Sequence, residues 1–414
     1  MQKLLFIRFG DLLLKGKNKR FFIQAIRKHL QHKLKDFVVA FDHRHDSSYL
    51  KYQEEDEAII IKLLQEIPGL YSFSKVYATN KTIESVVETA IKLVNEVLTE
   101  NDQTFKIETN RADKTFPTSS LEFTQTVAPL ILNGLDKKVK VAIKKPKYTL
   151  KIDIRQDYAY LNIGQIKGMG GFPYGSMGKG LMLTSGGIDS PVASYLAIKQ
   201  GIDVSLLHFE STPLTPLESV QKVIDIAKKL SKYTIDGKIT LHLVPFIRIH
   251  QDILSNIPEQ YSITIMRRMM YRIADKFMDA NNIQAMINGE SVGQVASQTL
   301  ESMNVVEAVT VKPILRPVIT YDKIDIIELA KRIETFDISI RPFEDCCSIY
   351  VPKNPVTRPK TYIAERYEEK LDLDITKTIE NIITIKVSPN SQINLSDYGF
   401  DVQEAFQALG ELKI

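Results

Sequence analysis

Residues 181–201 read LMLTSGGIDSPVASYLAIKQG and set a short polar loop between an apolar run and a run of helix formers. The apolar run Leu181–Thr184 predicts a buried strand, and the apolar spacing after Pro191 predicts one face of a helix. Gly186 and Gly187 let the backbone turn sharply and approach a ligand, and the loop opens onto a helix N-terminus, which favours an anion. A phosphate would fit there. An ordinary capped turn explains the same residues, since Ser, Asp and Pro are common at the start of helices.

The common nucleotide-binding signatures are absent from this loop. Gly178-Lys179 is followed by Gly180 and lacks the earlier glycine of a Walker A loop. Gly186-Gly187-Ile188 does not supply the Gly-x-Gly-x-x-Gly of a dinucleotide fingerprint. Residues 185–190, SGGIDS, instead resemble the PP-loop of ATP pyrophosphatases, which cleave ATP between the α and β phosphates and adenylate a substrate.

The composition is that of a globular protein: 414 residues, 44% apolar and 25% charged, enough for two or three domains. Arg8 and Asp11 interrupt the N-terminal segment where a signal peptide would be apolar, and no stretch has the apolar length of a membrane span. We therefore expect a cytoplasmic protein with no membrane partner. The two cysteines, Cys346 and Cys347, are adjacent, which excludes a disulfide framework and a two-pair zinc site within one chain.

Two blocks before the loop carry basic residues and no acidic ones. They lie between Asp11 and Asp36 and between Asp136 and Asp153. Two such blocks suggest a surface for a polyanion, with nucleic acid the leading candidate, although a single block is by default a solvated face. Their basic residues are Lys15, Lys17, Lys19, Arg20, Arg27, Lys28, Lys33 and Lys35, and then Lys137, Lys138, Lys140, Lys144, Lys145, Lys147 and Lys151.

Strands alternate with helices beyond the loop, which predicts a parallel sheet covered on both faces. Ligands bind such sheets at the carboxyl ends of the strands. The loop 185–190, His208-Phe209 and Gly289-Glu290 each follow or end a predicted strand and could line one pocket. Plainer readings stay open: His208 and Phe209 as core residues, and Arg267 or Arg268 as a solvated helix face.

The whole chain resembles the tRNA uridine 4-sulfurtransferase (4-thiouridine synthetase) family. The matching stretches, in order between residues 7 and 359, are IRFGDLLLKGKNKRFF, KIETNRADKTFPTSS, GMGGFPYGSMGKGLMLTSGGIDSPVASYLAIKQG, INGESVGQVASQTLESM and RPFEDCCSIYVPKNPVTRP. The resemblance implies a multidomain α+β and α/β protein. Its expected parts are an N-terminal ferredoxin-like domain (1–58), a THUMP RNA-binding domain (59–166), a glycine-rich linker (167–176) and a PP-loop ATP pyrophosphatase domain with a doubly wound parallel sheet (177–414).

The resemblance also implies the reaction. ATP adenylates O4 of the uridine at position 8 of tRNA, and a cysteine persulfide then attacks the activated carbon, which yields 4-thiouridine, AMP and pyrophosphate. Two alternatives remain: a catalytically silent THUMP RNA-binding protein, and a different PP-loop tRNA-modifying enzyme. The intact SGGIDS loop together with Cys346 argues against the first, and the THUMP-like stretch without paired cysteine motifs argues against the second.

Site residues follow from the resemblance, position by position. Ser185, Gly186, Gly187, Asp189 and Ser190 would hold the ATP pyrophosphate, with Asp189 also orienting Mg²⁺. Leu183, Thr184, His208 and Phe209 would line the adenine and ribose pocket, and Arg267, Gly289 and Gln298 would complete the ATP contacts. Cys346 aligns with the catalytic cysteine and Cys347 is an extra neighbour, and the sequence leaves open which thiol reacts. The expected tRNA-binding residues are Lys15, Lys17, Lys19, Arg20, Arg111, Lys114, Lys144 and Lys145.

The sulfur supply follows from the positions of the cysteines. Some family members carry a C-terminal rhodanese domain whose cysteine accepts the persulfide, but no cysteine follows Cys347 in this sequence. We therefore expect a short form that receives sulfur directly from a cysteine desulfurase. The same absence counts against the family's second role, sulfur transfer for the thiazole of thiamine biosynthesis. The resemblance further implies a homodimer.

Overall fold

The computed structural model describes residues 2–10, 12, 16–44, 47–294, 298–343 and 355–400. Their contacts divide the chain into two compact units, Met1–Gly171 and Phe172–Ile414. None of the helices in these ranges combines the length and the apolar character needed to cross a membrane.

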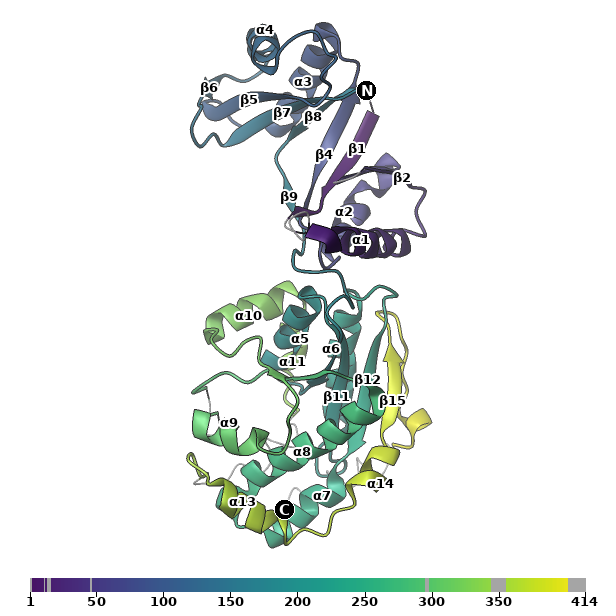
Figure 1. The fold of residues 1–414 in the computed structure, drawn as a ribbon, viewed down its shortest axis with the longest axis vertical. Helices are drawn as coiled ribbons and strands as arrows, with labels where there is room; N and C mark the ends of the chain where they lie inside the picture. The colour runs from purple at the N-terminus through teal and green to yellow at the C-terminus, as the bar shows by residue number, and fades with distance from the viewer. Residues whose placement is uncertain are drawn as a thin grey trace. The chain divides into compact units, whose positions relative to one another are not determined.

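One sheet runs through the whole first unit (Figure 1). Its order in the described residues is β2-β3-β1-β4-β8-β7-β5-β6, and β9 pairs with β4. The central strand β4 pairs antiparallel with β1 on one side and with β8 on the other, so the sheet joins two halves of the unit. The strands are β1 (Gln2–Arg8), β2 (Ala40–His43), β3 (Ser47–Lys51), β4 (Ser72–Thr79), β5 (Gln103–Arg111), β6 (Val139–Val141), β7 (Tyr148–Ile154), β8 (Ala159–Ile163) and β9 (Ile166–Lys167).

Each helix of the first unit buries one row of mainly apolar side chains. Ser119 caps the last of them by accepting from the backbone of Glu122, whose side chain accepts in return from the backbone of Ser119. Val86, Val127 and Leu150 belong to one apolar core of the second half of the sheet and are fully buried. The helices are α1 (Lys19–Lys33), α2 (Glu57–Gln65), α3 (Ile83–Val97) and α4 (Ser120–Asn133), and the 3-10 turns η2 (Gly16–Asn18) and η3 (Glu54–Asp56) precede α1 and α2.

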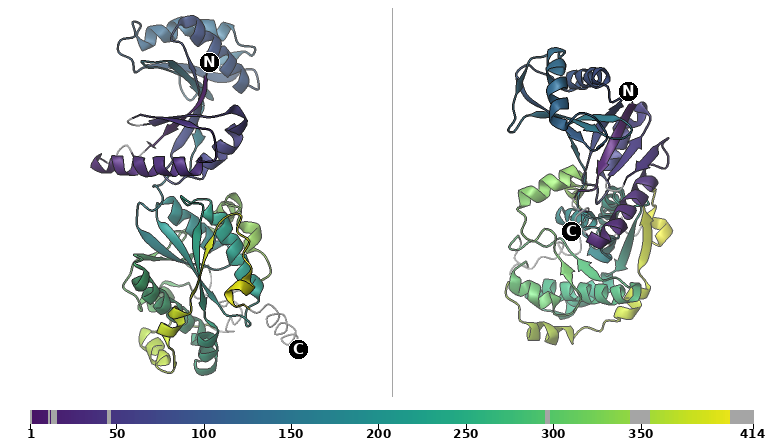
Figure 2. Two further views of the ribbon diagram at one scale, coloured as in Figure 1. Left: turned by 90° about the vertical axis from the view of Figure 1, so that its right-hand side faces the viewer. Right: turned by 45° about the horizontal axis from the view of Figure 1, so that its top comes forward.

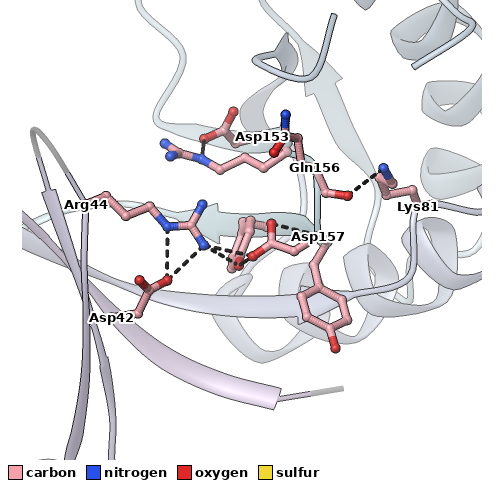
Figure 3. Close-up of polar contacts among 9 residues, drawn as sticks. Asp42, Arg44, Lys81, Asp153, Gln156 and Asp157 are labelled. Carbon is pink, nitrogen blue, oxygen red and sulfur yellow. Dashed lines mark hydrogen bonds and ion pairs between the residues drawn. The ribbon is translucent and has the colours of Figure 1, made fainter. Parts of the chain in front are cut away.

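A charged cluster ties the β2–β3 hairpin to the β7–β8 hairpin (Figure 3). The Arg44 guanidinium donates to Asp42 at 2.9 Å, to Asp157 at 2.8 Å and to the Tyr160 hydroxyl at 3.3 Å. Its carbon lies 4.8 Å from the centre of the Tyr49 ring, within cation–π range. Burial alone would raise the pKa of Asp157, but hydrogen bonds from Tyr160 and Arg44 outweigh it and lower that pKa to about 2. The cluster therefore links the two halves of the sheet.

The Arg44–Asp157 pair is expected to contribute modestly to stability. Because the two side chains are 26% and 38% exposed, water screens the pair, and a double-mutant cycle of Arg44→Ala and Asp157→Ala should give a coupling of about 0.5–1 kcal/mol at pH 7. Since the pKa of Asp157 is lowered by folding, this coupling is complete above pH 4 and is lost as the pH falls towards 2. Urea unfolding followed by tyrosine fluorescence measures this coupling energy. The same coupling energy at pH 7 and near pH 2 would contradict its dependence on the ionised Asp157.

The sheet of the second unit is parallel except at one edge. Its order in the described residues is β14-β13-β10-β11-β12-β15, and β15 alone runs antiparallel, paired with β12. The predicted parallel sheet is confirmed, with β15 as an addition that the sequence pattern did not indicate. The strands are β10 (Lys179–Leu183), β11 (Asp203–Glu210), β12 (Ile239–Pro245), β13 (Ala285–Ile287), β14 (Ile314–Leu315) and β15 (Ile383–Val387).

Helices cover both faces of this sheet (Figure 2). Helices α5 and α6 lie on one face with α10 and α11 packed on them, and α8 lies on the other with α7, α9, α13 and α14. Met266 and Met269 of α8 are 2% and 4% exposed, which confirms their predicted role in packing. The helices are α5 (Asp189–Lys199), α6 (Leu217–Ser231), α7 (Ile247–Asn256), α8 (Glu259–Asn281), α9 (Leu300–Glu307), α10 (Lys323–Arg332), α11 (Phe336–Ser339), α13 (Thr361–Glu368) and α14 (Ile375–Glu380), and the 3-10 turn η4 (Leu395–Tyr398) comes last.

The buried His242 on β12 makes the second unit sensitive to acid. Its Nδ1 lies 2.9 Å from the Thr384 hydroxyl on β15, and burial lowers its pKa to about 4. A lowered pKa stabilises the fold above the unfolded value of about 6.5, and this contribution is lost as the pH falls towards 4. Between pH 7 and pH 4.5 the wild type should lose about 2 kcal/mol of unfolding free energy more than His242→Gln, as measured by urea unfolding. Equal losses in both proteins would show that His242 is not the titrating group.

Candidate active site

The SGGIDS loop is closed by its own serines. The Ser185 N–H donates to the Ser190 hydroxyl at 3.1 Å, and that hydroxyl donates to the Ser185 carbonyl at 2.8 Å. The Gly187 N–H donates to the Ser185 hydroxyl at 3.2 Å. These bonds fold the loop between β10 and α5 against the first turn of the helix, so the predicted strand, tight loop and helix are all present.

Three strand ends meet at one edge of the sheet. Strand β10 lies between β11 and β13, and all three run parallel, so the residues that follow them share one edge. The Thr184 N–H donates to the Leu207 carbonyl at 2.8 Å, and His208 Nδ1 lies 3.1 Å from the Thr184 carbonyl. Because a carbonyl can only accept, Nδ1 of His208 carries the hydrogen. Thr184 and His208 are both buried, and this bond fixes the imidazole beside the loop.

Phe209 and Leu183 belong to the apolar core at this edge. The Phe209 ring packs edge to face on Phe246, with 5.3 Å between the ring centres, and Phe209 is buried. Leu183 is partly buried against the same core.

Gly289, the second residue after β13, touches the start of α5. A Cβ atom on Gly289 would lie 2.8 Å from the Ser190 nitrogen and 2.9 Å from the Asp189 carbonyl carbon. Real side chains do not approach backbone atoms that closely, so only glycine allows this contact. The loop after β13 and the SGGIDS loop thus form one surface.

A buried carboxylate organises the cations beside Gly289. Glu290 is 8% exposed and forms ion pairs with Arg267 of α8 and with Arg316, whose Nε lies 2.8 Å away. It also accepts a hydrogen bond from Asn288 at 2.8 Å, and Asn288 donates to the Tyr271 hydroxyl at 2.6 Å. Of these partners, sequence reasoning singled out only Arg267. Arg316 also donates to Glu307 at 3.3 Å, so two carboxylates hold the two guanidinium groups in place beside Gly289.

Lys323 is a further cation that the sequence analysis missed. It is the first residue of α10, and its ammonium lies 2.8 and 2.9 Å from the two carboxylate oxygens of Asp189. Both side chains keep contact with solvent, at 40% and 25% exposure. No local pattern marks Lys323, because its partner lies far away in the sequence.

Two buried polar atoms at predicted ATP positions have no hydrogen-bond partner among the described residues. They are Oγ1 of Thr184 and Oε1 of Gln298. Buried polar side-chain atoms in proteins are mostly paired, so an unpaired hydroxyl and an unpaired amide oxygen suit a polar ligand. The Gly293 N–H donates to the Gln298 carbonyl at 3.0 Å.

A metal site is less evident than a nucleotide site. In the described ranges no three His, Cys, Asp or Glu side chains come together as metal ligands would. The carboxylate of Asp189, the predicted Mg²⁺ ligand, is bonded to Lys323.

The predicted cysteines, Cys346 and Cys347, lie outside the described residues, as does Lys15. The chain that leads to the cysteines is described as far as Phe343. It passes beside the loop, because the Ser339 hydroxyl at the end of α11 donates to the Gly187 carbonyl at 3.1 Å.

The predicted tRNA-binding residues of the first basic block surround the start of α1. Lys17, in η2, and Arg20 are exposed, and Lys19 is half-buried. The block therefore presents cationic groups at the start of a helix of the first unit.

The later tRNA-binding candidates lie at the end of β5 and in the turns that follow β5 and β6. Lys114, Lys144 and Lys145 are exposed. Arg111, at the end of β5, is half-buried and donates to the Phe116 carbonyl at 2.9 Å, which also gives it a role in shaping the 112–118 turn.

Comparison with known proteins places the chain among enzymes of tRNA thiolation. It is 50% identical over 410 residues to a probable tRNA sulfurtransferase of Acholeplasma laidlawii, with 99% of each chain covered. A probable tRNA sulfurtransferase of Listeria welshimeri is 40% identical over 392 residues, with 94% of this chain and 96% of that protein covered. The chain belongs to the tRNA sulfurtransferase family.

Family models and a solved structure agree with this assignment. The model for Thiamine biosynthesis protein (ThiI) matches residues 175–373, that for the ThiI ferredoxin-like domain matches 4–74, and that for the THUMP domain matches 80–163. A crystal structure of a 4-thiouridine synthetase–RNA complex with bound ATP superposes with a TM-score of 0.84 at 31% identity, covering 94% of this chain and all of that one. The predicted family and the predicted fold of this sulfurtransferase family member are confirmed.

Proposed function

We propose that this chain is an ATP-dependent tRNA sulfurtransferase that forms 4-thiouridine at position 8 of tRNA. The observation that carries the proposal is the closed SGGIDS loop, which packs on Gly289 at the edge where Thr184 keeps a buried, unpaired hydroxyl. A loop of this shape at a helix N-terminus suits a nucleotide. The 4-thiouridine synthetase that resembles this chain at 31% identity was crystallised with RNA and ATP, which supports both ligands here.

Adenylation uses the residues around the loop. The O4 atom of the uridine attacks the α-phosphate of ATP, and pyrophosphate leaves. The loop residues Ser185–Ser190 would hold the departing pyrophosphate at the N-terminus of α5, whose dipole favours an anion. Lys323 and Arg267 would stabilise the charge that develops on it. Asp189 is the residue that we propose to hold Mg²⁺, which would neutralise further phosphate charge.

Sulfur transfer then uses a persulfide on Cys346 or Cys347. Its terminal sulfur forms a bond to C4 of the uridine while the C4–O bond to AMP breaks, so AMP leaves. A thiol next attacks the inner sulfur, the S–S bond to the transferred sulfur breaks, and 4-thiouridine and a protein disulfide result. A cysteine desulfurase would supply the sulfur, and a thiol reductant would restore the cysteine.

Basic residues of the first unit are the proposed contacts to the tRNA backbone. They are Lys17, Lys19 and Arg20 near the start of α1, and Arg111, Lys114, Lys144 and Lys145.

We further propose a homodimer in the cytoplasm. The proposed domain limits are 1–58, 59–166 and 177–414, with the linker 167–176. The two units Met1–Gly171 and Phe172–Ile414 support a major division close to that linker.

A single-turnover assay tests the proposed function. Protein, unmodified tRNA, ATP with Mg²⁺ and a cysteine desulfurase with cysteine are mixed, and pyrophosphate and 4-thiouridine are measured together. Asp189→Ala should lose both products, with exposed Asp372→Ala as the matched control. Of Cys346→Ala and Cys347→Ala, the variant that lacks the reactive thiol should release pyrophosphate without forming 4-thiouridine. A wild type that binds tRNA but forms neither product would favour the silent RNA-binding alternative.

A further inference from the structure

A buried lysine lies between the SGGIDS loop and the chain that leads to the cysteines. Lys222, in the middle of α6, is only 5% exposed. Its ammonium donates to the carbonyl of Arg341 at 3.2 Å and to the carbonyl of Phe343 at 3.0 Å. Lysine is almost never buried without partners, because removing its charge from water is costly. The two backbone carbonyls therefore compensate the buried charge of Lys222 and fix the position of its side chain.

The other side of Lys222 faces the loop. A Cβ atom on Gly186 would lie 2.6 Å from Cε of Lys222 and 3.2 Å from its Nζ. The absence of a side chain at Gly186 thus makes room for the lysine. The lysine side chain is therefore packed beside the loop in a buried setting.

Two further contacts fasten the same chain segment. The Ser339 hydroxyl donates to the Gly187 carbonyl at 3.1 Å, and the Arg341 guanidinium donates to Asp225 of α6 at 2.6 Å. Together with the bonds from Lys222, they hold residues 339–343 against both the loop and α6. In the sequence, Cys346 follows Phe343 by three positions.

We infer that Lys222 is a positioning residue for the sulfur-transfer step. Its ammonium holds the Arg341 and Phe343 carbonyls on one side and the side chain packs against Gly186 of the loop on the other, so it links the loop to the chain that leads into the cysteine segment. It acts through the backbone and touches none of the reacting atoms at C4. This inference rests on the proposed function and adds to it a residue that serves the second half-reaction.

The kinetic test compares Lys222→Met with Lys229→Met, a matched change on the same helix at a residue that pairs with Glu334 on the surface. In single turnover, Lys222→Met should release pyrophosphate within threefold of the wild-type rate and form 4-thiouridine at least tenfold more slowly. Lys222→Arg, which keeps the charge and the donors, should recover part of the thiolation rate. If pyrophosphate release falls as much as thiolation, Lys222 serves ATP binding or loop integrity, and the inference is overturned.

Hydrogen exchange tests whether Lys222 holds this segment without relying on activity. Peptides from residues 336–343 should exchange at least threefold faster in Lys222→Met than in the wild type or in Lys229→Met, with and without ATP. Peptides from α8 serve as the folding control and should exchange equally in all three proteins. Equal exchange of residues 336–343 would overturn the inference. If the wild type forms no 4-thiouridine, the proposed function fails, while this comparison still decides whether Lys222 holds the segment.

Discussion

Gly289→Ala is expected to lower the rate of ATP-dependent pyrophosphate release by about 100-fold or more, because displacing a binding loop by a fraction of an ångström to 1 Å misplaces the reacting groups. The new Cβ would meet the Ser190 nitrogen at 2.8 Å and the Asp189 carbonyl carbon at 2.9 Å. Both are backbone atoms, which cannot rotate away as a side chain can. The start of α5 or the loop after β13 must therefore move.

The control for this prediction is Gly237→Ala. A Cβ at Gly237 would meet nothing within 4 Å, although its φ of +68° strains any side chain. That strain costs about 1–2 kcal/mol of folding free energy and leaves the loop in place. Single-turnover pyrophosphate release should stay close to wild type in Gly237→Ala. Near-normal release in Gly289→Ala would show that the contact between β13 and α5 is not needed for adenylation.

Glu368→Ala is expected to destabilise the second unit by about 3–5 kcal/mol, because it leaves a buried guanidinium without its carboxylate. Arg268 of α8 is 1% exposed and donates to both oxygens of Glu368 on α13, at 2.6 and 3.0 Å. It also donates to the Val305 carbonyl of α9 at 2.5 Å, and Arg272 adds a bond of 2.8 Å to Glu368. The Arg268 guanidinium thus joins three helices, α8, α9 and α13.

The pH dependence provides a second measure of the same cluster. Burial alone would raise the pKa of Glu368, but the hydrogen bonds from Arg268 and Arg272 outweigh it and lower that pKa. The stabilisation is therefore complete above the unfolded value of about 4.3 and is lost as the pH falls through the folded value. Urea unfolding should show a large difference between wild type and Glu368→Ala at pH 7 and a smaller one at pH 3. The exposed Glu365→Ala on the same helix is the control, and an equally small effect for both variants would contradict the prediction.

Much of the site's framework was predictable from local sequence. The apolar run, the two glycines and the helix formers of residues 181–201 specify a strand, a loop and a helix, because each depends on contacts between near neighbours. The alternation of strands and helices beyond the loop likewise specifies a parallel sheet. Since the carboxyl ends of parallel strands meet at one edge, the proximity of the loop to His208 and Gly289 followed from topology before any distance was known.

The partners of the charged residues were not predictable in this way. Arg267 and Arg268 are neighbours on α8, and the sequence alone allowed either to be a solvated helix residue. In the structure Arg267 pairs with Glu290 beside the loop, whereas Arg268 is buried against Glu368. Successive helix residues point in directions about 100° apart, and their partners lie on other elements, so no local pattern separates the two roles.

The sequence by itself determined the family, the strand–loop–helix unit and the pair of adjacent cysteines on which the proposed chemistry depends. Tertiary structure alone decided that Lys323 pairs with Asp189 and that Lys222 lies between Gly186 and Phe343. Lys323 is 134 positions from Asp189, and Lys222 is 121 positions from Phe343. The physical reason is that motifs of contiguous residues encode backbone geometry, whereas the pairing of charges arises only when packing removes side chains from water and leaves each buried charge to be compensated by a distant group.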